Sequence, residues 1–366
     1  MRVDWLELQQ FRIYDELRFA PDPGINVLVG SNAAGKTTVL EAVAYSSALR
    51  SFRRSPDQAL VKTGAPVAVV RTGFAKASGE TKVEIELPAV GRRRVLLNGK
   101  RPVRHSDVAA TVPVVAFLPD DLDLVKDSAG TRRRYLDDLG SQLAPGYGAA
   151  LGDYEQTLRQ RNALLRRDGP NVDPLSLQVW DDRLIKAAVA LWAERAALVD
   201  RLSPVLTGAH QSVAAASEPL HIALTPGWGE SPLVRWGDPA TAADALSTAL
   251  QQRRRREMEQ RTTTVGPHRD DPTLHLGRRD TRTQASQGEQ RSVAVALRVA
   301  AYRLLQDRHG HPPVLLLDDV FSELDLVRTA AVVDMLPAGQ VFITTTRDDE
   351  IPVAGRRWDV GDGKLR

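Results

Sequence analysis

The sequence contains no cysteine. A chain without thiols cannot form disulfide bonds, bind a metal through thiolates or use a cysteine nucleophile, and such a composition suits a reducing compartment. Long apolar stretches are also missing, since no uninterrupted run approaches the ~20 residues that cross a bilayer. The first four residues, MRVD, lack the apolar core of a signal peptide. We therefore expect a cytoplasmic protein with no membrane partner.

A strong excess of one charge is absent as well. The formal net charge is only +3, from 49 lysines and arginines against 46 aspartates and glutamates, so the whole-chain charge does not indicate a nucleic-acid partner. Arginines nevertheless cluster in segments 50–54, 92–94, 132–134 and 253–256. One cluster is typical of a solvated face, whereas four favour a polyanionic partner. The candidate DNA contacts are Arg50, Arg53 and Arg54.

One glycine-containing motif stands out against this background. Residues 30–37 read GSNAAGKT and match the pattern G-x-x-x-x-G-K-[ST]. The apolar run 25–29 before it has the character of a buried strand, and we expect a helix from Lys36 to about Leu49 after it. A strand before and a helix after are the context that a phosphate-binding loop requires. The predicted nucleotide contacts are Gly30, Ser31, Asn32, Ala33, Ala34, Gly35, Lys36, Thr37 and Thr38.

The chemistry of this motif indicates ATP and Mg²⁺. Glycines let the backbone curl so that successive N–H groups point at phosphate oxygens, and the helix N-terminus adds a partial positive charge. Lys36 would reach the β- and γ-phosphates, and the Thr37 hydroxyl would be a magnesium ligand. The alternative is a chance match in an ordinary glycine-containing turn. Ala33 stands where many such loops carry glycine, which makes this loop less permissive.

An acidic pair late in the chain supports the nucleotide interpretation. Residues 314–319 read VLLLDD, which predicts a buried parallel strand that delivers two carboxylates to its C-terminal edge. Asp318 would hold magnesium through water, and Asp319 would polarise the attacking water as the catalytic residue. The alternative is a strand that ends in a solvated acidic turn. Residues 341–346 predict one more strand, which ends in hydroxyl side chains.

A second anion-binding candidate precedes that strand. Residues 285–291 read ASQGEQR and open a predicted helix. Ser286 with Glu289 three residues later is a capping box, which is the structural alternative. Gly288 would allow an anion to approach the helix N-terminus closely. The acidic pair is followed by the segment 321–325, FSELD.

The remaining segments divide the chain coarsely. We predict two antiparallel strands within 3–20 around a turn near Asp15–Glu16, and strands at 67–71, 82–87, 94–97 and 112–117. The first three would form a β arm with a hairpin turn at Asn98–Gly99. Residues from about 130 to 260 have helical spacing without a heptad repeat. The polar loop 266–271 contains His268, to which the residues alone assign no role.

The order of these motifs resembles the ATP-binding-cassette type of ATPase head, which includes the SMC-like chromosome and repair ATPases. Six further segments narrow the resemblance to the bacterial RecF family of recombinational repair proteins, over nearly the whole chain. They are 11–14 (FRIY), 50–53 (RSFR), 121–126 (DLDLVK), 132–137 (RRRYLD), 265–271 (VGPHRDD) and 286–288 (SQG).

The resemblance implies an α/β fold, a P-loop ABC-type head with a mixed sheet, flanking helices and a β arm, plus a mostly helical lobe. We expect residues 1–125 and 263–366 to form the head and residues 126–262 the lobe. Such heads bind ATP between two subunits. Ser286 would act in trans, and Gly288 would contact the γ-phosphate with it. Asp325 would cross the interface, and Arg12 and Tyr14 would lie near nucleotide or DNA.

The resemblance further implies a slow, DNA-stimulated ATPase of recombinational repair and replication restart. ATP would close a homodimer on double-stranded, single-stranded or gapped DNA, with RecR and RecO as partners in recombinase loading. Asp319 in place of the usual glutamate, no histidine at 344–346 and no glutamine at 117–120 favour slow hydrolysis. The alternatives are a transporter-type nucleotide-binding subunit, and a nucleotide-gated scaffold with negligible turnover.

Overall fold

The computed structural model describes residues 1–76, 79–104, 106–214, 218–228, 238–322, 324–334, 339–361 and 363–366. The chain forms two compact units. Unit 1 comprises 1–122, 208–217 and 291–366, and unit 2 comprises 123–207 and 218–290. None of the helices within the described ranges combines the length and the apolar character needed to cross a membrane.

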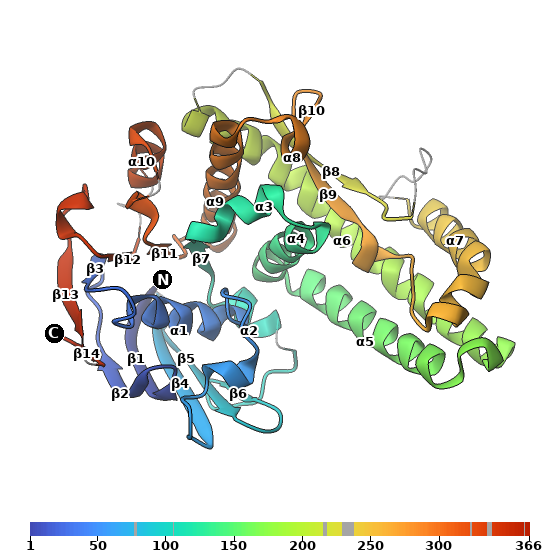
Figure 1. Ribbon diagram of the computed structural model, residues 1–366, viewed down its shortest axis with the longest axis horizontal. Coiled ribbons are helices and arrows are strands. Elements are labelled where there is room, and N and C mark those ends of the chain that lie inside the picture. The colour runs from blue at the N-terminus through green and yellow to red at the C-terminus, as the bar shows by residue number, and fades with distance from the viewer. Residues whose placement is uncertain are drawn as a thin grey trace. The chain divides into compact units, whose positions relative to one another are not determined.

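A six-stranded sheet forms one layer of unit 1 (Figure 1). Its order is β14 (Lys364–Leu365), β13 (Arg356–Gly361), β3 (Ile25–Val29), β12 (Val341–Thr345), β11 (Val314–Asp318) and β7 (Val114–Phe117). All its neighbours pair in parallel except β13 and β14. Every residue of β11 and β12 is buried, as their apolar sequences require in a covered parallel sheet. The predicted strands are confirmed, whereas β13 and β14 were not predicted.

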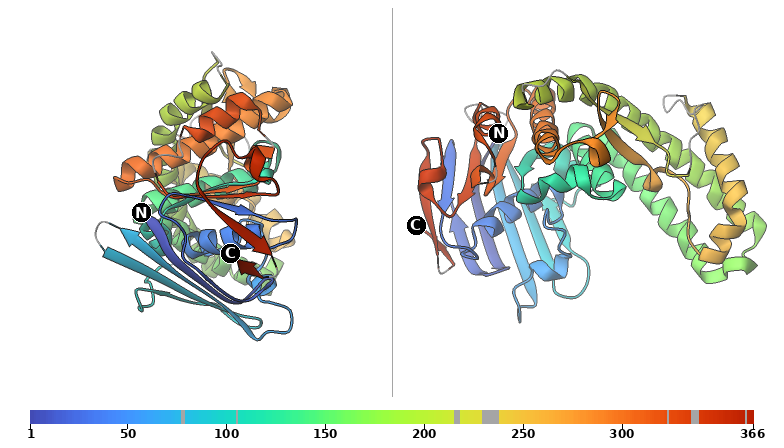
Figure 2. Two further views of the ribbon diagram at one scale, coloured as in Figure 1. Left: turned by 90° about the vertical axis from the view of Figure 1, so that its left-hand side faces the viewer. Right: turned by 45° about the horizontal axis from the view of Figure 1, so that its top comes forward.

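A five-stranded antiparallel sheet forms the second layer of unit 1. Its order is β2 (Tyr14–Phe19), β1 (Arg2–Phe11), β4 (Val67–Lys76), β5 (Gly79–Pro88) and β6 (Arg94–Leu97). Because β4 pairs with β1, the predicted β arm is wrong as a separate appendage; its strands extend the N-terminal hairpin, as the blue strands in Figure 2 show. The predicted turn at Asn98–Gly99 is confirmed, with φ of 52° and 74°.

The N-terminal hairpin turns earlier than the sequence indicated. Phe11 faces Tyr14 across β1 and β2, so the turn is Arg12–Ile13 and not near Asp15–Glu16. Arg12 has φ of 55°, and its guanidinium donates to both carboxylate oxygens of the buried Glu41 at 3.0 and 2.9 Å. This tertiary ion pair holds the turn at a residue that local sequence does not mark.

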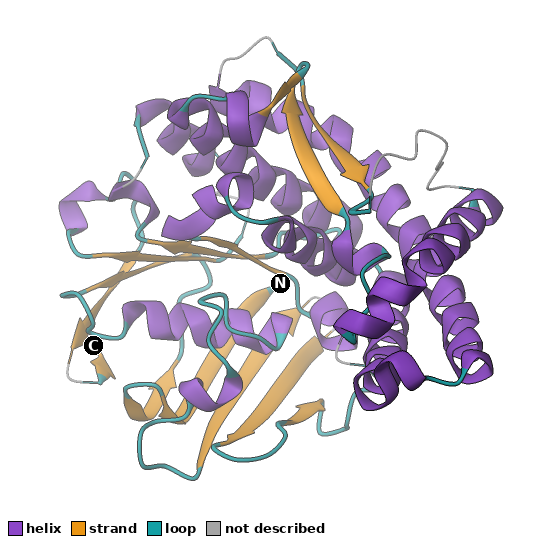
Figure 3. Cartoon of the chain, turned by 45° about the vertical axis from the view of Figure 1, so that its right-hand side comes forward, coloured by secondary structure: helices purple, strands orange, loops and turns teal. Residues whose placement is uncertain are grey.

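One helix joins the two layers of unit 1. Helix α1 (Lys36–Ala48) is buried along most of its length and lies between the two sheets (Figure 3). Its buried residues include the polar Lys36, Thr38 and Glu41 as well as apolar side chains. Shorter helices complete the unit: α2 (Ser106–Thr111), α10 (Leu326–Val333), and the 3₁₀ turns η1 (Asp57–Leu60), η2 (Pro119–Leu122), η5 (Val320–Ser322) and η7 (Asp348–Glu350).

Unit 2 is mostly helical, as predicted. Its helices are α3 (Asp123–Lys126), α4 (Ala129–Leu143), α5 (Pro145–Asp168), η3 (Gly169–Asn171), most of α6 (Pro174–Ala214), α7 (Pro239–Gln260), η4 (Pro267–Arg269), α8 (Thr281–Gln284) and the start of α9 (Gln287–His309). The later part of α9 belongs to unit 1.

A small sheet in unit 2 was missed by the sequence interpretation. Strand β8 (Leu220–Thr225) pairs antiparallel with β9 (Asp271–Leu276), which also pairs with β10 (Arg279–Asp280). Because β9 pairs with β8, residues 263–290 group with the helical unit, whereas we predicted them with the C-terminal part of the head. The pairing joins segments about fifty residues apart, which local patterns do not encode.

Candidate nucleotide-binding site

The loop between β3 and α1 has a conformation that requires its glycines. Gly35 has φ of 110°, and a Cβ at this position would lie 2.6 Å from the Tyr14 hydroxyl oxygen. A Cβ at Gly30 would lie 2.4 Å from the carbonyl oxygen of Val360. Ala33 also takes a positive φ, 64°, which costs an alanine more than a glycine. The loop therefore adopts a tight curl despite the alanine.

Lys36 lies inside this curl. Its side chain is almost fully buried, and Nζ donates to the carbonyl oxygens of Gly30 and Ser31 at 2.7 and 2.8 Å. Burial lowers the pKa of Lys36, and the charges of Asp319 and Asp318 partly oppose that shift. The ammonium group is thus fixed to the loop between β3 and α1.

A hydroxyl and a carboxylate meet at the C-terminal edge of the six-stranded sheet. The Thr37 hydroxyl donates to Asp318 Oδ1 at 2.8 Å, which joins the start of α1 to the end of β11. Burial raises the pKa of Asp318, and hydrogen bonds from Thr344 and Thr37 oppose the shift. The two residues predicted to bind magnesium are therefore together.

These oxygen donors fit a magnesium ion. Mg²⁺ in nucleotide sites is usually held by one or two protein oxygens together with phosphate oxygens and water. Thr37 can donate its proton to Asp318 and still offer lone pairs to a cation. The described residues contain no group of three or more His, Cys, Asp or Glu side chains arranged for a metal. The donor set thus suits a cation that binds with the nucleotide.

Asp319, the predicted catalytic carboxylate, follows directly. Its φ is 51°, a left-handed conformation that is uncommon for a residue other than glycine. The backbone N–H of Asp319 donates to the Thr344 hydroxyl oxygen at 2.9 Å. Its side chain is half-buried, and its charge acts on Lys36. The Thr344 hydroxyl contacts both residues of the acidic pair, whereas the Thr345 hydroxyl donates to the carbonyl oxygen of Arg347. The sequence did not make this distinction.

The second predicted anion site, Ser286–Gly288, belongs to unit 2 and forms the capping box. Ser286 Oγ accepts from the N–H of Glu289 at 3.3 Å, and Glu289 Oε2 accepts from the N–H of Ser286 at 2.7 Å. Arg279 binds Glu289 at 2.8 Å and also Glu218 at 2.7 Å. The hydrogen bonds from Arg279 and Ser286 lower the pKa of Glu289 to about 2. The capping box, which was the alternative to an anion site, is therefore formed within the single chain.

Asp325 caps a helix in unit 1. Its Oδ1 accepts from the N–H of Arg328 at 3.0 Å at the start of α10, and the same arginine binds Asp325 Oδ2. Arg328 also donates to Ser292 Oγ at 2.9 Å. In the single chain Asp325 thus has an intramolecular partner. Glu323 of the same segment lies outside the described residues.

The loop that carries the candidate DNA contacts is anchored to α1. Ser51 Oγ donates to Glu41 Oε1 at 2.5 Å, beside the Arg12 ion pair. Arg53 and Arg54 are exposed, and Arg50 is half-buried. Burial raises the pKa of Asp318, and the positive charge of Arg53 partly opposes that rise, so this arginine acts on the candidate nucleotide site.

The other three arginine clusters each contain a residue with a structural ion pair. Arg93 binds Asp57 at 3.1 Å and Arg132 binds Asp271 at 2.8 Å. Arg254 binds Asp181 at 2.7 Å. These three arginines are therefore not simply solvated, because carboxylates distant in sequence bind them.

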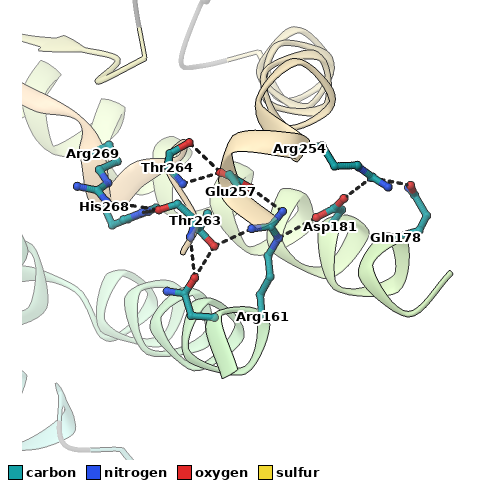
Figure 4. A network of polar contacts seen from close by, with 10 residues as sticks. Arg161, Gln178, Asp181, Arg254, Glu257, Thr263, Thr264, His268 and Arg269 are labelled. Carbon is teal, nitrogen blue, oxygen red and sulfur yellow. Dashed lines mark hydrogen bonds and ion pairs between the residues drawn. The ribbon is translucent and has the colours of Figure 1, made fainter. Parts of the chain in front are cut away.

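His268 is a half-buried residue of unit 2. Its Nδ1 lies 2.6 Å from the Tyr154 hydroxyl oxygen, and its Nε2 lies 3.1 Å from the carbonyl oxygen of Thr263. Figure 4 shows it beside Thr263 in a network centred on Arg161. Burial lowers the pKa of His268 to about 4. Since a carbonyl can only accept, Nε2 carries the proton and Nδ1 accepts from the tyrosine.

Comparison with known proteins agrees with this architecture. The family model described as "RecF/RecN/SMC N terminal domain" matches residues 2–360. The chain is 37% identical to the DNA replication and repair protein RecF of Streptomyces avermitilis, covering 100% of this chain and 99% of that protein. It is 36% identical to the RecF of Halalkalibacterium halodurans, covering 96% of this chain and 94% of that one.

Superposition on solved structures also supports the predicted fold. A structure described as the recombination mediator protein RecF with ATP in the RecFOR pathway superposes with a TM-score of 0.89, at 27% identity, covering 100% of this chain and 98% of that one. An Smc head domain from Pyrococcus furiosus superposes with a TM-score of 0.53 at 16% identity, which supports the fold alone. The predicted fold class, a P-loop ABC-type ATPase head with a helical lobe, is confirmed. The chain belongs to the RecF family of DNA replication and repair proteins.

Proposed function

We propose that this chain binds ATP with Mg²⁺ and that ATP closes a homodimer on DNA, which slow hydrolysis reopens. The observation that carries the proposal is the hydrogen bond between Thr37 and Asp318, with Lys36 held in the adjoining loop. Phosphate-binding N–H groups, a cation ligand and acidic side chains meet at one sheet edge, where open α/β sheets bind ligands. A solved RecF structure described as bound to ATP supports the same cofactor.

In this proposal each residue has a stated task. The loop 30–35 and the N-terminus of α1 bind the phosphates, and Lys36 neutralises the β- and γ-phosphates. Thr37 and Asp318 hold the magnesium ion, which supplies charge neutralisation at the phosphates. Asp319 accepts hydrogen bonds from the attacking water and orients it. The positive charge of Arg53 opposes the rise in the pKa of Asp318 that burial causes.

The proposed dimer needs the second copy at the terminal phosphate. Ser286 and Gly288 of that copy would contact the γ-phosphate, and Asp325 would reach across the interface. In function, residues 1–125 and 263–366 would act as the ATPase head and 126–262 as the lobe, although residues 263–290 group with the helical unit in the structure. The DNA would be double-stranded, single-stranded or gapped, and RecR- and RecO-type proteins would be partners in loading recombinase. The structures of RecF relatives from the RecFOR pathway support these partners.

The site assignment is tested by Lys36→Met. We expect loss of ATP binding and of ATP-dependent retention on DNA, because the buried ammonium that neutralises the phosphates is gone. Fluorescent ATP-analogue titration and a DNA retention assay measure the two effects. Undiminished retention with the variant would contradict the assignment of the nucleotide site.

The dimer is tested by Ser286→Arg. We expect normal ATP binding by each chain but no ATP-induced dimer and no turnover, since a bulky cation would obstruct the partner's phosphate contact. Analytical ultracentrifugation with a slowly hydrolysed ATP analogue measures the dimer. A normal dimer in the variant would exclude the proposed contact.

ATP hydrolysis with and without duplex DNA separates the competing functions. Stimulation by DNA supports the clamp. Turnover without stimulation would favour a transporter-type nucleotide-binding subunit, and no turnover in either condition would favour a nucleotide-gated scaffold.

A further inference from the structure

One threonine hydroxyl connects the two acidic residues of the candidate site. Asp318 and Thr344 are paired positions on the parallel neighbours β11 and β12. The Thr344 hydroxyl lies 2.7 Å from Asp318 Oδ1 and 2.9 Å from the backbone nitrogen of Asp319. Thr344 is 1% exposed. The hydroxyl is thus surrounded by protein and placed between the two acidic residues.

The direction of both hydrogen bonds follows from the groups involved. The N–H of Asp319 can only donate, so the Thr344 oxygen accepts from it. An ionised Asp318 carboxylate can only accept, so the single hydroxyl proton of Thr344 points at Oδ1. Thr344 has one orientation that satisfies both contacts. The Thr37 hydroxyl donates to the same Oδ1, so this oxygen is occupied and Oδ2 remains for a water ligand of the cation.

The second contact fixes an unusual backbone. Asp319 has φ of 51°, and a residue with a Cβ persists in that conformation only where its surroundings hold it. The hydrogen bond from its N–H to Thr344 is such a restraint. The direction in which the Asp319 side chain leaves the strand is set by this backbone conformation.

We infer that Thr344 is a positioning residue for the acidic pair, orienting Asp318 for the magnesium ion and Asp319 for the attacking water. The inference rests on the proposed nucleotide site and names a residue that holds its geometry. Thr344 touches neither phosphate nor metal in this role; it acts through the two aspartates. A serine would suffice, because the hydroxyl makes both contacts.

The test compares three substitutions at one position. Thr344→Val keeps the shape and removes the hydroxyl, Thr344→Ser keeps the hydroxyl, and Thr344→Ala is a second hydroxyl-free variant should valine prevent folding. Thr72→Val is the matched control. Thr72 is a buried threonine of β4 in unit 1, and its hydroxyl lies 2.7 Å from Ser46 Oγ.

The first measurement needs neither nucleotide nor metal. Hydrogen–deuterium exchange of the peptide that contains Asp319 should be faster in Thr344→Val than in the wild type, because the amide loses its acceptor. Thr344→Ser should exchange as the wild type does. Unchanged exchange in the valine and alanine variants would overturn the inference.

The second measurement is the Mg²⁺ concentration for half-maximal binding of a fluorescent ATP analogue. We expect about a tenfold increase in Thr344→Val, from the loss of a hydrogen bond to a charged group, and wild-type values in Thr344→Ser and Thr72→Val. Equal impairment in the serine and valine variants would overturn the inference, since packing would then be responsible. Failure of the wild type itself to bind would instead contradict the proposed function.

Discussion

At the scale of single residues, burial sets the protonation of two neighbours in unit 2. Asp270 is fully buried and accepts from Trp192 Nε1 at 2.6 Å. Burial raises the pKa of Asp270 to about 7, although Arg195 and Trp192 oppose the shift. Burial lowers the pKa of His268 to about 4. The two groups therefore contribute to stability with opposite dependence on pH.

The sign for Asp270 follows from linkage. Its pKa is higher in the folded chain than the ~4 of an unfolded aspartate, so the protonated form stabilises the fold. This contribution is present below pH ~4 and is lost as the pH rises through about 7. His268 has a folded pKa below its unfolded ~6.5, so its contribution is present above that pH and is lost as the pH falls through about 4.

Asp270→Asn should remove the first contribution, because an amide cannot ionise and its oxygen can still accept from Trp192. Relative to this variant, the wild type should lose about 1–3 kcal/mol of unfolding free energy between pH 5 and pH 8. Urea unfolding at the two pH values measures the difference. Asp200→Asn, at an exposed position of α6, is the control. Parallel pH profiles in the wild type and Asp270→Asn would show that Asp270 does not titrate in this range.

At the scale of elements, α4 and α5 pack closely because one position lacks a side chain. A Cβ at Gly140 of α4 would lie 2.5 Å from ring carbons of Tyr147 in α5. Tyr147 is 1% exposed and donates to Asp137 at 2.7 Å, so its ring has little room to move. By contrast, a Cβ at Gly152 of α5 would meet nothing within 4 Å.

The same substitution at these two glycines should therefore have opposite effects. Gly140→Ala should destabilise the chain by about 1–3 kcal/mol through overpacking. Gly152→Ala should stabilise it by about 0.5–1 kcal/mol, because alanine has the higher helix propensity. Urea midpoints measure both changes. Stabilisation by Gly140→Ala would show that α4 and α5 can move apart to accommodate the added methyl group without a loss of stability.

A buried ion network connects α5, α6 and α7 (Figure 4). Arg161 is 1% exposed and donates to Asp181 Oδ1 at 2.8 Å and to Thr263 Oγ1 at 2.7 Å. Its Nη2 lies 2.8 Å from Glu257 Oε2, an ion pair without the alignment of a hydrogen bond. Arg254 supplies a second cation to Asp181. Charges buried in this way require all partners to be present.

Arg161→Met should destabilise unit 2 by about 3–5 kcal/mol, because it leaves buried carboxylates without their main cation. The matched control is Arg159→Met on the same helix, whose ion pair with Glu155 is exposed. An exposed pair contributes at most about 1 kcal/mol. Urea unfolding followed by circular dichroism measures both variants. Equal small losses would show that the network is replaceable by apolar packing.

At the scale of the whole molecule, the small net charge of +3 leaves DNA affinity to local groups. Much of the arginine content is neutralised within the chain, as the pairs of Arg93, Arg132 and Arg254 illustrate. The exposed Arg53 and Arg54 follow α1 and the candidate nucleotide site. These two side chains are therefore the most specific test of phosphate contacts in the proposed function.

Arg53→Glu/Arg54→Glu should weaken DNA binding and make the slope of log affinity against log salt shallower by about 1–2, since each lost phosphate contact accounts for about 0.9. Fluorescence anisotropy with duplex DNA at several salt concentrations measures the slope. Arg18→Glu, a charge reversal on the exposed part of β2, is the control. ATP-analogue titration checks that the nucleotide site remains intact. An unchanged slope would assign these arginines to a solvated face.

Local sequence determined much of this protein. The strand before residue 30, the helix from Lys36 and the turn at Asn98–Gly99 were predicted, and the capping box at Ser286 was identified as the alternative to an anion site. Each depends on residues within a few positions of one another. The buried run 314–318 was predicted for the same reason, since its composition alone requires cover on both faces.

Only the tertiary structure decided which distant residues meet. Thr37 and Asp318 are 281 positions apart, and Asp318 and Thr344 are 26 apart. Strand β8 pairs with β9, which lies about fifty residues further along the chain. The ion pair between Arg12 and Glu41 fixes the position of the N-terminal hairpin turn. These contacts depend on strand order and register. Both are set by the packing of the complete core, and neither produces a pattern of hydrophobic residues within a single segment.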